Sequence, residues 1–214
     1  MRFHSTRGGP SVSFTEAVAQ GLAPDGGLYL PRQFPDFSSE LKRWVDLDYP
    51  SLCVEFFRHF ATDLTEKDLD QCVHSAYAGF SHVDTAPLVE LGEKWQCLEL
   101  FHGPTLAFKD FALQLLGNFY EYYLSNKNEK INIVVATSGD TGAAAIDAIK
   151  GKENINIFVL HPNNRISSVQ RKLMTTGKEK NVFNIALKGS FDDCQNLVKV
   201  MFTDKTFANA ITMS

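Results

Sequence analysis

The sequence lacks the features that mark a membrane, secreted or nucleic-acid-binding protein. No apolar run approaches the roughly 20 residues of a membrane span, and the first residues, MRFHSTRGG, lack the apolar segment of a secretory signal. Acidic and basic residues are mixed in a chain of net charge −4, so no basic block can follow a phosphate backbone. We therefore expect a cytoplasmic protein whose partners include neither membrane nor nucleic acid.

Cysteine and histidine are too scattered for a disulfide framework or a metal site. The six histidines form no pair placed to share a metal, and the four cysteines show no CxxC spacing (Cys53, Cys72, Cys97, Cys194). Such cysteines are typical of reduced, mostly buried side chains in the cytosol. We predict no structural metal.

Two common nucleotide-binding motifs are also missing. The sequence has no GxGxxG, and the apolar run at 155–160 leads into HPNN rather than into an acidic residue that would hold a ribose. No Walker lysine follows the glycines of 137–142. A nucleotide cofactor is therefore not indicated.

What the chain does contain is enough apolar material for a substantial core, 44% of 214 residues, and an organisation that changes near residue 85. Before this point the pattern predicts short helices and turns. Ser13 and Glu16 form a capping box, Pro50 opens a helix and Thr65 caps another. Gly26 belongs to a turn that feeds a short strand closed by Pro31.

After residue 85 apolar strands alternate with helices. We predict strands at 96–101, 131–136, 155–160 and 182–187, each followed by a helix, at about 108–125, 141–150, 167–176 and 191–202. Continuous apolar strands separated by helices are typical of parallel βαβ units with helices on both faces. The prediction is an α/β fold, with a helical, turn-rich region over 1–85 and a doubly wound, mostly parallel sheet over 86–214.

Two loops of this second region have an unusual composition. The segment HGPTLAFKD places Lys109 among apolar residues, whereas an ordinary surface lysine has polar neighbours. The segment TSGDTGAA offers Gly139 and Gly142 for a close backbone approach, hydroxyl groups, and the amides that begin a helix. These features suit a carboxylate or a phosphate, and they equally suit an ordinary helix-capping turn.

Read together, the two loops suggest one site. Chemistry in a doubly wound sheet gathers at the carboxyl ends of its strands, where both loops are expected. An amine in apolar surroundings, next to an anion-binding turn, suits a lysine that forms a Schiff base with a carbonyl cofactor.

At this point the sequence resembles a known family. The segments ELFHGPTLAFKDFALQ and VATSGDTGAAA look like the paired signatures of threonine synthases, pyridoxal-phosphate (PLP) enzymes of the tryptophan-synthase β fold type II. The segment SFTEAVAQGLAPDGGLYLP resembles the family's N-terminal region, so the resemblance covers nearly the whole chain. It implies a lyase of threonine biosynthesis that converts O-phospho-L-homoserine and water to L-threonine and phosphate.

The resemblance also implies roles for individual residues. Lys109 would carry PLP as a Schiff base and, once released by the substrate, act as the general base. Phe108 and Asp110 would contact the cofactor, and His102 would either move protons or be structural. A further set would hold anionic groups of the substrate, chiefly its carboxylate: Thr137, Ser138, Gly139, Asp140 and Thr141.

Two departures from the family pattern shape the expectations. Many relatives in the wider fold type carry Asn where Asp140 stands, and that amide contacts the phenolic oxygen of PLP. We therefore expect Asp140 to turn outward or to carry a proton. The chain also stops at NAITMS without the glycine-rich loop that holds the cofactor phosphate in the family.

We accordingly expect an N-terminal portion, inactive by itself, with the family's N-terminal domain over 1–85 and the first part of the PLP-dependent domain over 86–214. Two alternatives stay open: another PLP-dependent amino-acid lyase, and a non-catalytic module that binds anions. A monomer and a homodimer are both compatible with the sequence.

Overall fold

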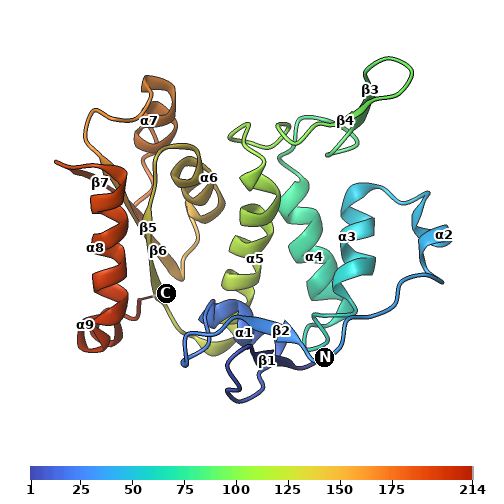
Figure 1. Ribbon diagram of the computed structural model, residues 1–214, viewed down its shortest axis with the longest axis horizontal. Coiled ribbons are helices and arrows are strands. Elements are labelled where there is room, and N and C mark those ends of the chain that lie inside the picture. Colours follow the sequence, from blue (N-terminus) through green and yellow to red (C-terminus); the bar gives the residue numbers. More distant parts are fainter. Residues whose placement is uncertain (214) are drawn as a thin grey trace.

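The structure is a computed structural model that describes residues 1–213 (Figure 1). Its first part consists of short elements whose ends are set by capping side chains. Ser13 and Glu16 form the predicted capping box of α1, which ends at Gly21, and Thr65 caps α4. The elements are β1 (Phe3–Ser5), α1 (Phe14–Gln20), β2 (Tyr29–Pro31), α2 (Leu41–Trp44), α3 (Tyr49–Phe57) and α4 (Glu66–Tyr77). The sequence analysis missed β1 and α2.

The predicted strand at 96–101 is the main error in the predicted fold. Only β4 (Gln96–Leu98) forms there, and it pairs antiparallel with β3 (Leu88–Glu90) in a two-stranded hairpin. Both strands are exposed along their whole length, and the hairpin projects from the molecule in Figure 1. Because the residues of β4 are exposed and pair only with β3 in the part of the chain that is described, this segment does not supply a buried strand of the parallel sheet.

The parallel sheet is formed by β5 (Ile131–Ala136), β6 (Ile155–Pro162) and β7 (Val182–Leu187), in the order β5-β6-β7. The connecting helices are α6 (Asp140–Ile149) and α7 (Ser168–Thr175), and α8 (Phe191–Thr203) and α9 (Lys205–Ala210) follow β7. Cys194 of α8 packs with Val134 and Leu160 on one face, whereas Ile146 of α6 packs with Ile157 on the other. Helices on both faces confirm the predicted α/β fold class.

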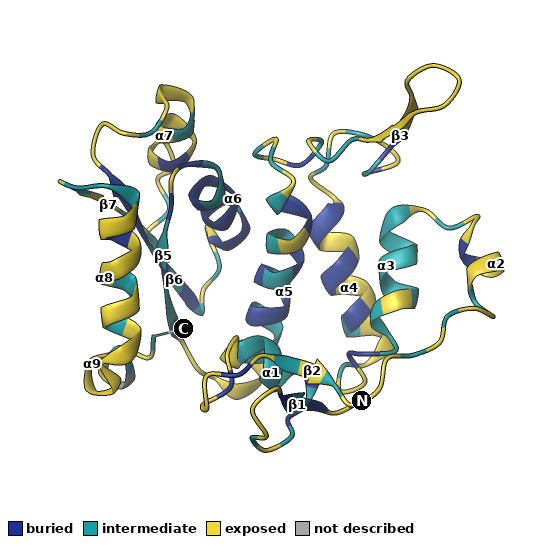
Figure 2. Cartoon of the chain, viewed as in Figure 1, coloured by how far each residue is buried: buried dark blue, intermediate teal, exposed yellow. Residues whose placement is uncertain are grey.

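Helix α5 (Lys109–Lys127) joins the two parts of the molecule (Figure 1). Its residues Phe111, Leu115 and Phe119 belong to the core of the N-terminal helices, and Tyr120 and Leu124 belong to the core of the sheet. Figure 2 shows this central helix largely buried, while α8 is mostly exposed. Packing on both sides fixes the helix, and therefore fixes where Lys109 lies.

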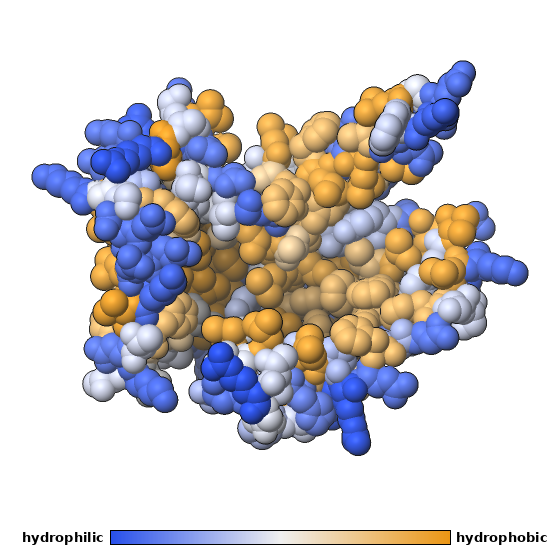
Figure 3. All heavy atoms as spheres, viewed as in Figure 1, coloured by the Kyte–Doolittle hydropathy of each residue, from blue (hydrophilic) through white to orange (hydrophobic). Residues whose placement is uncertain are grey.

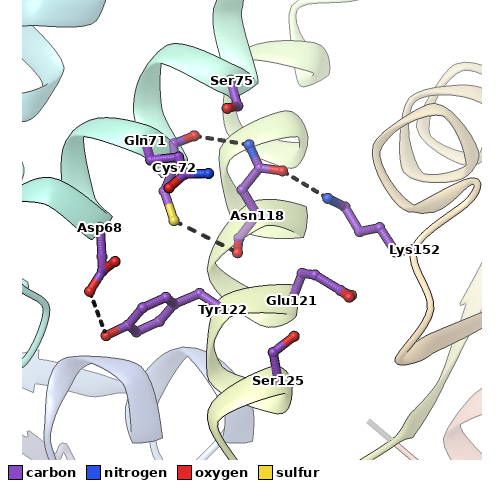
Figure 4. A pocket seen from close by; sticks show the side chains of 9 residues that line it. All are labelled: Asp68, Gln71, Cys72, Ser75, Asn118, Glu121, Tyr122, Ser125 and Lys152. Atoms are coloured by element: carbon purple, nitrogen blue, oxygen red, sulfur yellow. Dashed lines mark hydrogen bonds between the residues drawn. The ribbon is translucent and has the colours of Figure 1, made fainter.

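A polar cavity of about 230 Å³ lies where α4, α5 and the turn after α6 meet (Figure 4). Lys152 Nζ donates to Asn118 Oδ1 at 2.8 Å, and Asn118 Nδ2 donates to the carbonyl of Cys72 at 2.9 Å. Burial lowers the pKa of Lys152. This chain of hydrogen bonds links three elements across the interface between the two cores, which gives the cavity a structural role.

Hydrophobic atoms also reach the surface. In Figure 3 they line a hollow on the face in view, where an apolar groove of about 1060 Å³ lies between the α1 region and the C-terminal helices. None of the helices formed by residues 1–213 is long and apolar enough to cross a membrane.

Candidate active site

Lys109 is the first residue of α5, at the point where a tight loop turns into the helix. The predicted position at the end of a sheet strand was wrong, because the hairpin strand β4 ends well before the loop. The loop is held by Asp110, whose buried carboxylate accepts hydrogen bonds from the amide of Thr105 at 2.8 Å and from its hydroxyl at 2.6 Å. An acidic residue in the first turn also suits the helix dipole.

The amine of Lys109 is paired with a carboxylate. Lys109 Nζ donates to Asp140 Oδ2 at 2.9 Å, and it lies 4.4 Å from the centre of the Phe108 ring. The second oxygen of the carboxylate, Asp140 Oδ1, accepts a hydrogen bond from the amide of Thr141 at 2.9 Å. The side chains of Lys109 and Asp140 are 26% and 45% exposed, so solvent reaches the pair.

This pair describes Asp140 in the ligand-free protein, whereas the sequence expectation concerned Asp140 beside bound PLP. Its side chain does not turn away from the site, because it contacts Lys109. It does not carry a proton at neutral pH either, since the hydrogen bond from Lys109 lowers the pKa of Asp140 below its ordinary value. The sequence expectation considered only repulsion between the Asp140 carboxylate and the cofactor. It did not include the ammonium group of Lys109, which lies 31 residues earlier in the chain.

Lys109 opens onto a mainly apolar cavity of about 560 Å³, which is within the usual range for a small-molecule site. Burial raises the pKa of Tyr49 to about 12, so its hydroxyl stays neutral. Sequence reasoning did not find Tyr49, which begins α3 and reaches this cavity through the packing of α3 against the rest of the fold. The lining residues are Tyr49, Ala86, Leu98, Leu100, Phe108, Lys109, Phe111, Ala112, Leu113 and Thr141.

The loop before α6 uses most of its amides internally. Thr137 is buried, and its Oγ1 accepts hydrogen bonds from the amides of Gly139 at 3.0 Å and Gly142 at 2.8 Å. With the Thr141 amide bonded to Asp140, three of the expected anion-binding donors already have partners. The hydroxyl of Thr141 remains at the cavity, and Ser138 is exposed.

The two glycines of this loop are closely packed by the chain itself, and the close approach of a ligand that the sequence suggested for them stays a prediction. A Cβ atom on Gly142 would lie 2.5 Å from Thr137 Cγ2 and 2.8 Å from Met174 Sδ. Gly139 has a φ of +145°, and a Cβ there would meet the side chain of Gln170. Both glycines therefore permit close packing of the chain against itself.

His102 lies outside the cavity lining. Its Nε2 is 2.7 Å from Glu99 Oε2, its ring centre is 4.9 Å from that of His82, and its carbonyl accepts a hydrogen bond from the amide of Ser81. These contacts hold the His102 ring beside Glu99 and His82, and a role in proton transfer stays a prediction. In the part of the chain that is described, no group of three or more His, Cys, Asp or Glu residues is arranged to hold a metal ion.

Comparison with known proteins shows which family shares this arrangement. A family profile described as "Threonine synthase N terminus" matches residues 2–77. The crystal structure of PLP-bound threonine synthase from Brucella melitensis superposes on the whole chain with a TM-score of 0.95 and 44% sequence identity. The resemblance to threonine synthases is confirmed.

The sequence relatives agree with the structural one. Threonine synthase from Pseudomonas aeruginosa is 47% identical over 211 residues, which are 97% of this chain and 45% of that protein. The enzyme from Schizosaccharomyces pombe is 44% identical over 215 residues, which are 95% of this chain and 42% of that protein. The chain also covers 47% of the Brucella melitensis structure. It thus spans less than half the length of each of these relatives.

The residues around Lys109 fit part of PLP. A primary amine can condense with the aldehyde, and the Phe108 ring with the surrounding apolar side chains suits an aromatic ring. Of the cavity-lining residues described, Lys109 alone is positively charged, so the phosphate group would need donors from outside this set.

Proposed function

We propose that this protein is a threonine synthase, and that residues 1–213 provide the lysine side of its active site. The substrate would be O-phospho-L-homoserine, and the products L-threonine and phosphate. The observation that carries the proposal is Lys109 itself, a lysine at the edge of an apolar cavity and 2.9 Å from Asp140. The PLP-bound relative supports the choice of cofactor.

When bound, PLP would supply an electron sink for the negative charge that develops when a proton leaves the substrate's α-carbon. Lys109 would hold the cofactor and then move that proton, because no other lining residue carries an amine. The apolar walls of the cavity would exclude water from one side of the reacting atoms. The exclusion matters because electrostatic interactions strengthen when water is removed.

The segment 137–141 would receive the carboxylate of the substrate. Thr141 lines the cavity, Ser138 is exposed, and Asp140 lies between the two loops. Thr137 and Gly139 would act by shaping the loop, since the Thr137 hydroxyl oxygen accepts a hydrogen bond from the amide of Gly139. Asp110 would act in the same way on the Lys109 loop, and direct contact between Asp110 and the cofactor stays a prediction.

The test is turnover by the protein expressed from its complete gene, with PLP present. We expect release of phosphate and formation of threonine from O-phospho-L-homoserine. Serine or threonine offered as substrate should give little ammonia or oxoacid, which distinguishes this lyase from the alternative one. Lys109→Ala should reduce turnover by about 10²–10⁴, the usual contribution of a general base.

A matched control lies on the same helix. Lys127 ends α5, and its Nζ lies 5.6 Å from the centre of the Tyr123 ring, a setting comparable to that of Lys109 over Phe108. Lys127→Ala should therefore leave turnover unchanged. No threonine formation by the wild-type protein, or equal losses in both variants, would contradict the proposal.

We also propose a domain boundary near residue 85. We further propose that the protein is cytoplasmic. The first core draws on residues 1–80 but also on α5, which ties the proposed N-terminal domain to the rest of the chain. Four free cysteines support a reducing compartment.

A further inference from the structure

The carboxylate of Asp140 bridges two groups that the proposed reaction needs. One oxygen accepts a hydrogen bond from Lys109 Nζ, and the other accepts one from the amide of Thr141, each at 2.9 Å. The first group is the nucleophile, and the second is a donor near the start of α6. The Asp140 side chain therefore engages both the Lys109 amine and the Thr141 amide while no ligand is bound.

No other charge competes for Lys109. Within residues 1–213, Asp140 is the only carboxylate within ion-pair distance of Lys109. The remaining cavity-lining side chains are uncharged, and Tyr49 stays protonated because burial raises its pKa to about 12. The next acid on α6, Asp147, is engaged by Lys150 and by Gln114. The position of the Lys109 amine therefore depends on Asp140 more than on any other described group.

We propose that Asp140 restrains Lys109 in the ligand-free protein, and that the amine reacts with a carbonyl compound only after this ion pair has opened. The inference deepens the proposed function and rests on it for the identity of that compound. An ammonium ion has no lone pair to attack a carbonyl carbon. Lys109 must first lose one proton to solvent, after which a C=N bond forms and the carbonyl oxygen leaves as water.

Opening the pair has a second effect. A carboxylate that leaves Lys109 is free to rotate away from Thr141 as well, and this exposes an amide at the helix start for an incoming anion. Asp140 thus acts as a positioning residue that links reaction at Lys109 with anion binding at α6.

The experiment measures the reactivity of Lys109 directly, without PLP. PLP-free protein from the complete gene is pulsed with acetic anhydride at a fixed pH, and acetylation of each lysine is quantified by mass spectrometry of its peptides. Asp140→Asn keeps the size of the side chain and an oxygen acceptor for Thr141, but removes the negative charge. Circular dichroism and thermal unfolding verify that each variant is folded.

We expect Lys109 to be acetylated about two- to fivefold faster in Asp140→Asn than in the wild type, in line with the strength of solvent-accessible ion pairs. Asp140→Glu, which keeps the charge, should stay closer to the wild type. The matched control is Asp147→Asn on the same helix, which should release Lys150 and leave Lys109 unchanged. Unchanged or slower acetylation of Lys109 in a folded Asp140→Asn variant would overturn the inference.

A second measurement separates this inference from the proposed function. The rate at which PLP becomes covalently bound, followed by absorbance, should also rise in Asp140→Asn. Faster acetylation in a protein to which PLP does not bond would support the ion-pair restraint and sink the proposed function. Normal PLP bonding at Lys109 with unchanged acetylation in Asp140→Asn would support the proposed function and overturn the ion-pair restraint.

Discussion

The carboxylate of Asp110 is bound by Thr105 through two hydrogen bonds, one from the amide and one from the hydroxyl. Asp110 follows Lys109 directly, so this contact sets the direction in which the side chain of Lys109 leaves its loop. Gly103 lies against the same side chain, since a Cβ there would be 2.5 Å from Asp110 Cβ. Asp110 thus holds the loop that precedes Lys109 in its shape.

The first prediction concerns this contact. Asp110→Ala should destabilise the fold by about 1–3 kcal/mol, because the buried carboxylate is lost and both donors of the half-buried Thr105 lose their acceptor. Urea unfolding followed by circular dichroism measures the change. Thr105→Val removes only the hydroxyl and should cost less. If Asp110→Ala is as stable as the wild type, the carboxylate does not hold the loop.

The second prediction concerns the close packing at Gly142. Gly142→Ala should cost about 1–3 kcal/mol, because the new methyl group meets Thr137 and Met174 in a filled space. Gly79→Ala is the control, since no heavy atom lies within 4 Å of a Cβ there, and it should change stability by less than about 0.5 kcal/mol. Thermal unfolding distinguishes the two. If Gly142→Ala leaves stability unchanged and only weakens substrate binding, the glycine instead allows the close approach of a ligand that the sequence suggested.

The third prediction concerns the polar cavity of Figure 4. Asn118→Ala should destabilise the protein by about 1–3 kcal/mol, because Lys152 and the Cys72 carbonyl both lose a hydrogen-bond partner. Adding Lys152→Met to this variant should recover part of the loss, since no desolvated ammonium then remains unpaired. Equilibrium unfolding of both variants measures the difference. A double variant less stable than Asn118→Ala would argue that Lys152 stabilises through other contacts.

The fourth prediction is a pH dependence. The folded-state pKa of Asp140 is lowered, chiefly by the hydrogen bond from Lys109. The folded protein therefore binds fewer protons at Asp140 than the unfolded chain does, and the pair stabilises the fold above the ordinary aspartate pKa. That contribution should disappear as the pH falls through the lowered value. The melting-temperature difference between wild type and Asp140→Asn should shrink on acidification, and a difference that grows would contradict the assignment.

The sequence predicted those features that depend on neighbours along the chain. Ser13 caps α1 and Thr65 caps α4 because each accepts a hydrogen bond from the amide three residues later, a purely local contact. The strands at 131–136 and 182–187 were found because long apolar runs bounded by turns have few alternatives.

Features that depend on packing between distant segments were not predicted. The run at 96–101 does not show that its partner is the segment 88–90, and the exposed hairpin depends on a turn at Gly92, whose φ is +77°. The Lys109–Asp140 pair joins the starts of two helices, so it appears only when α5 packs on α6. Local composition singled out both loops and suggested that they share one site, but it could not show the direct contact between Lys109 and Asp140.

Lys109 is proposed to hold a carbonyl cofactor. The most direct test treats the protein from its complete gene with PLP, reduces it with borohydride to make the linkage permanent, and maps the modified peptide by mass spectrometry. The account predicts modification at Lys109, within the sequence LAFKDF, and none at Lys127 on the other end of α5. Modification at any other lysine, with Lys109 unmodified, would contradict it.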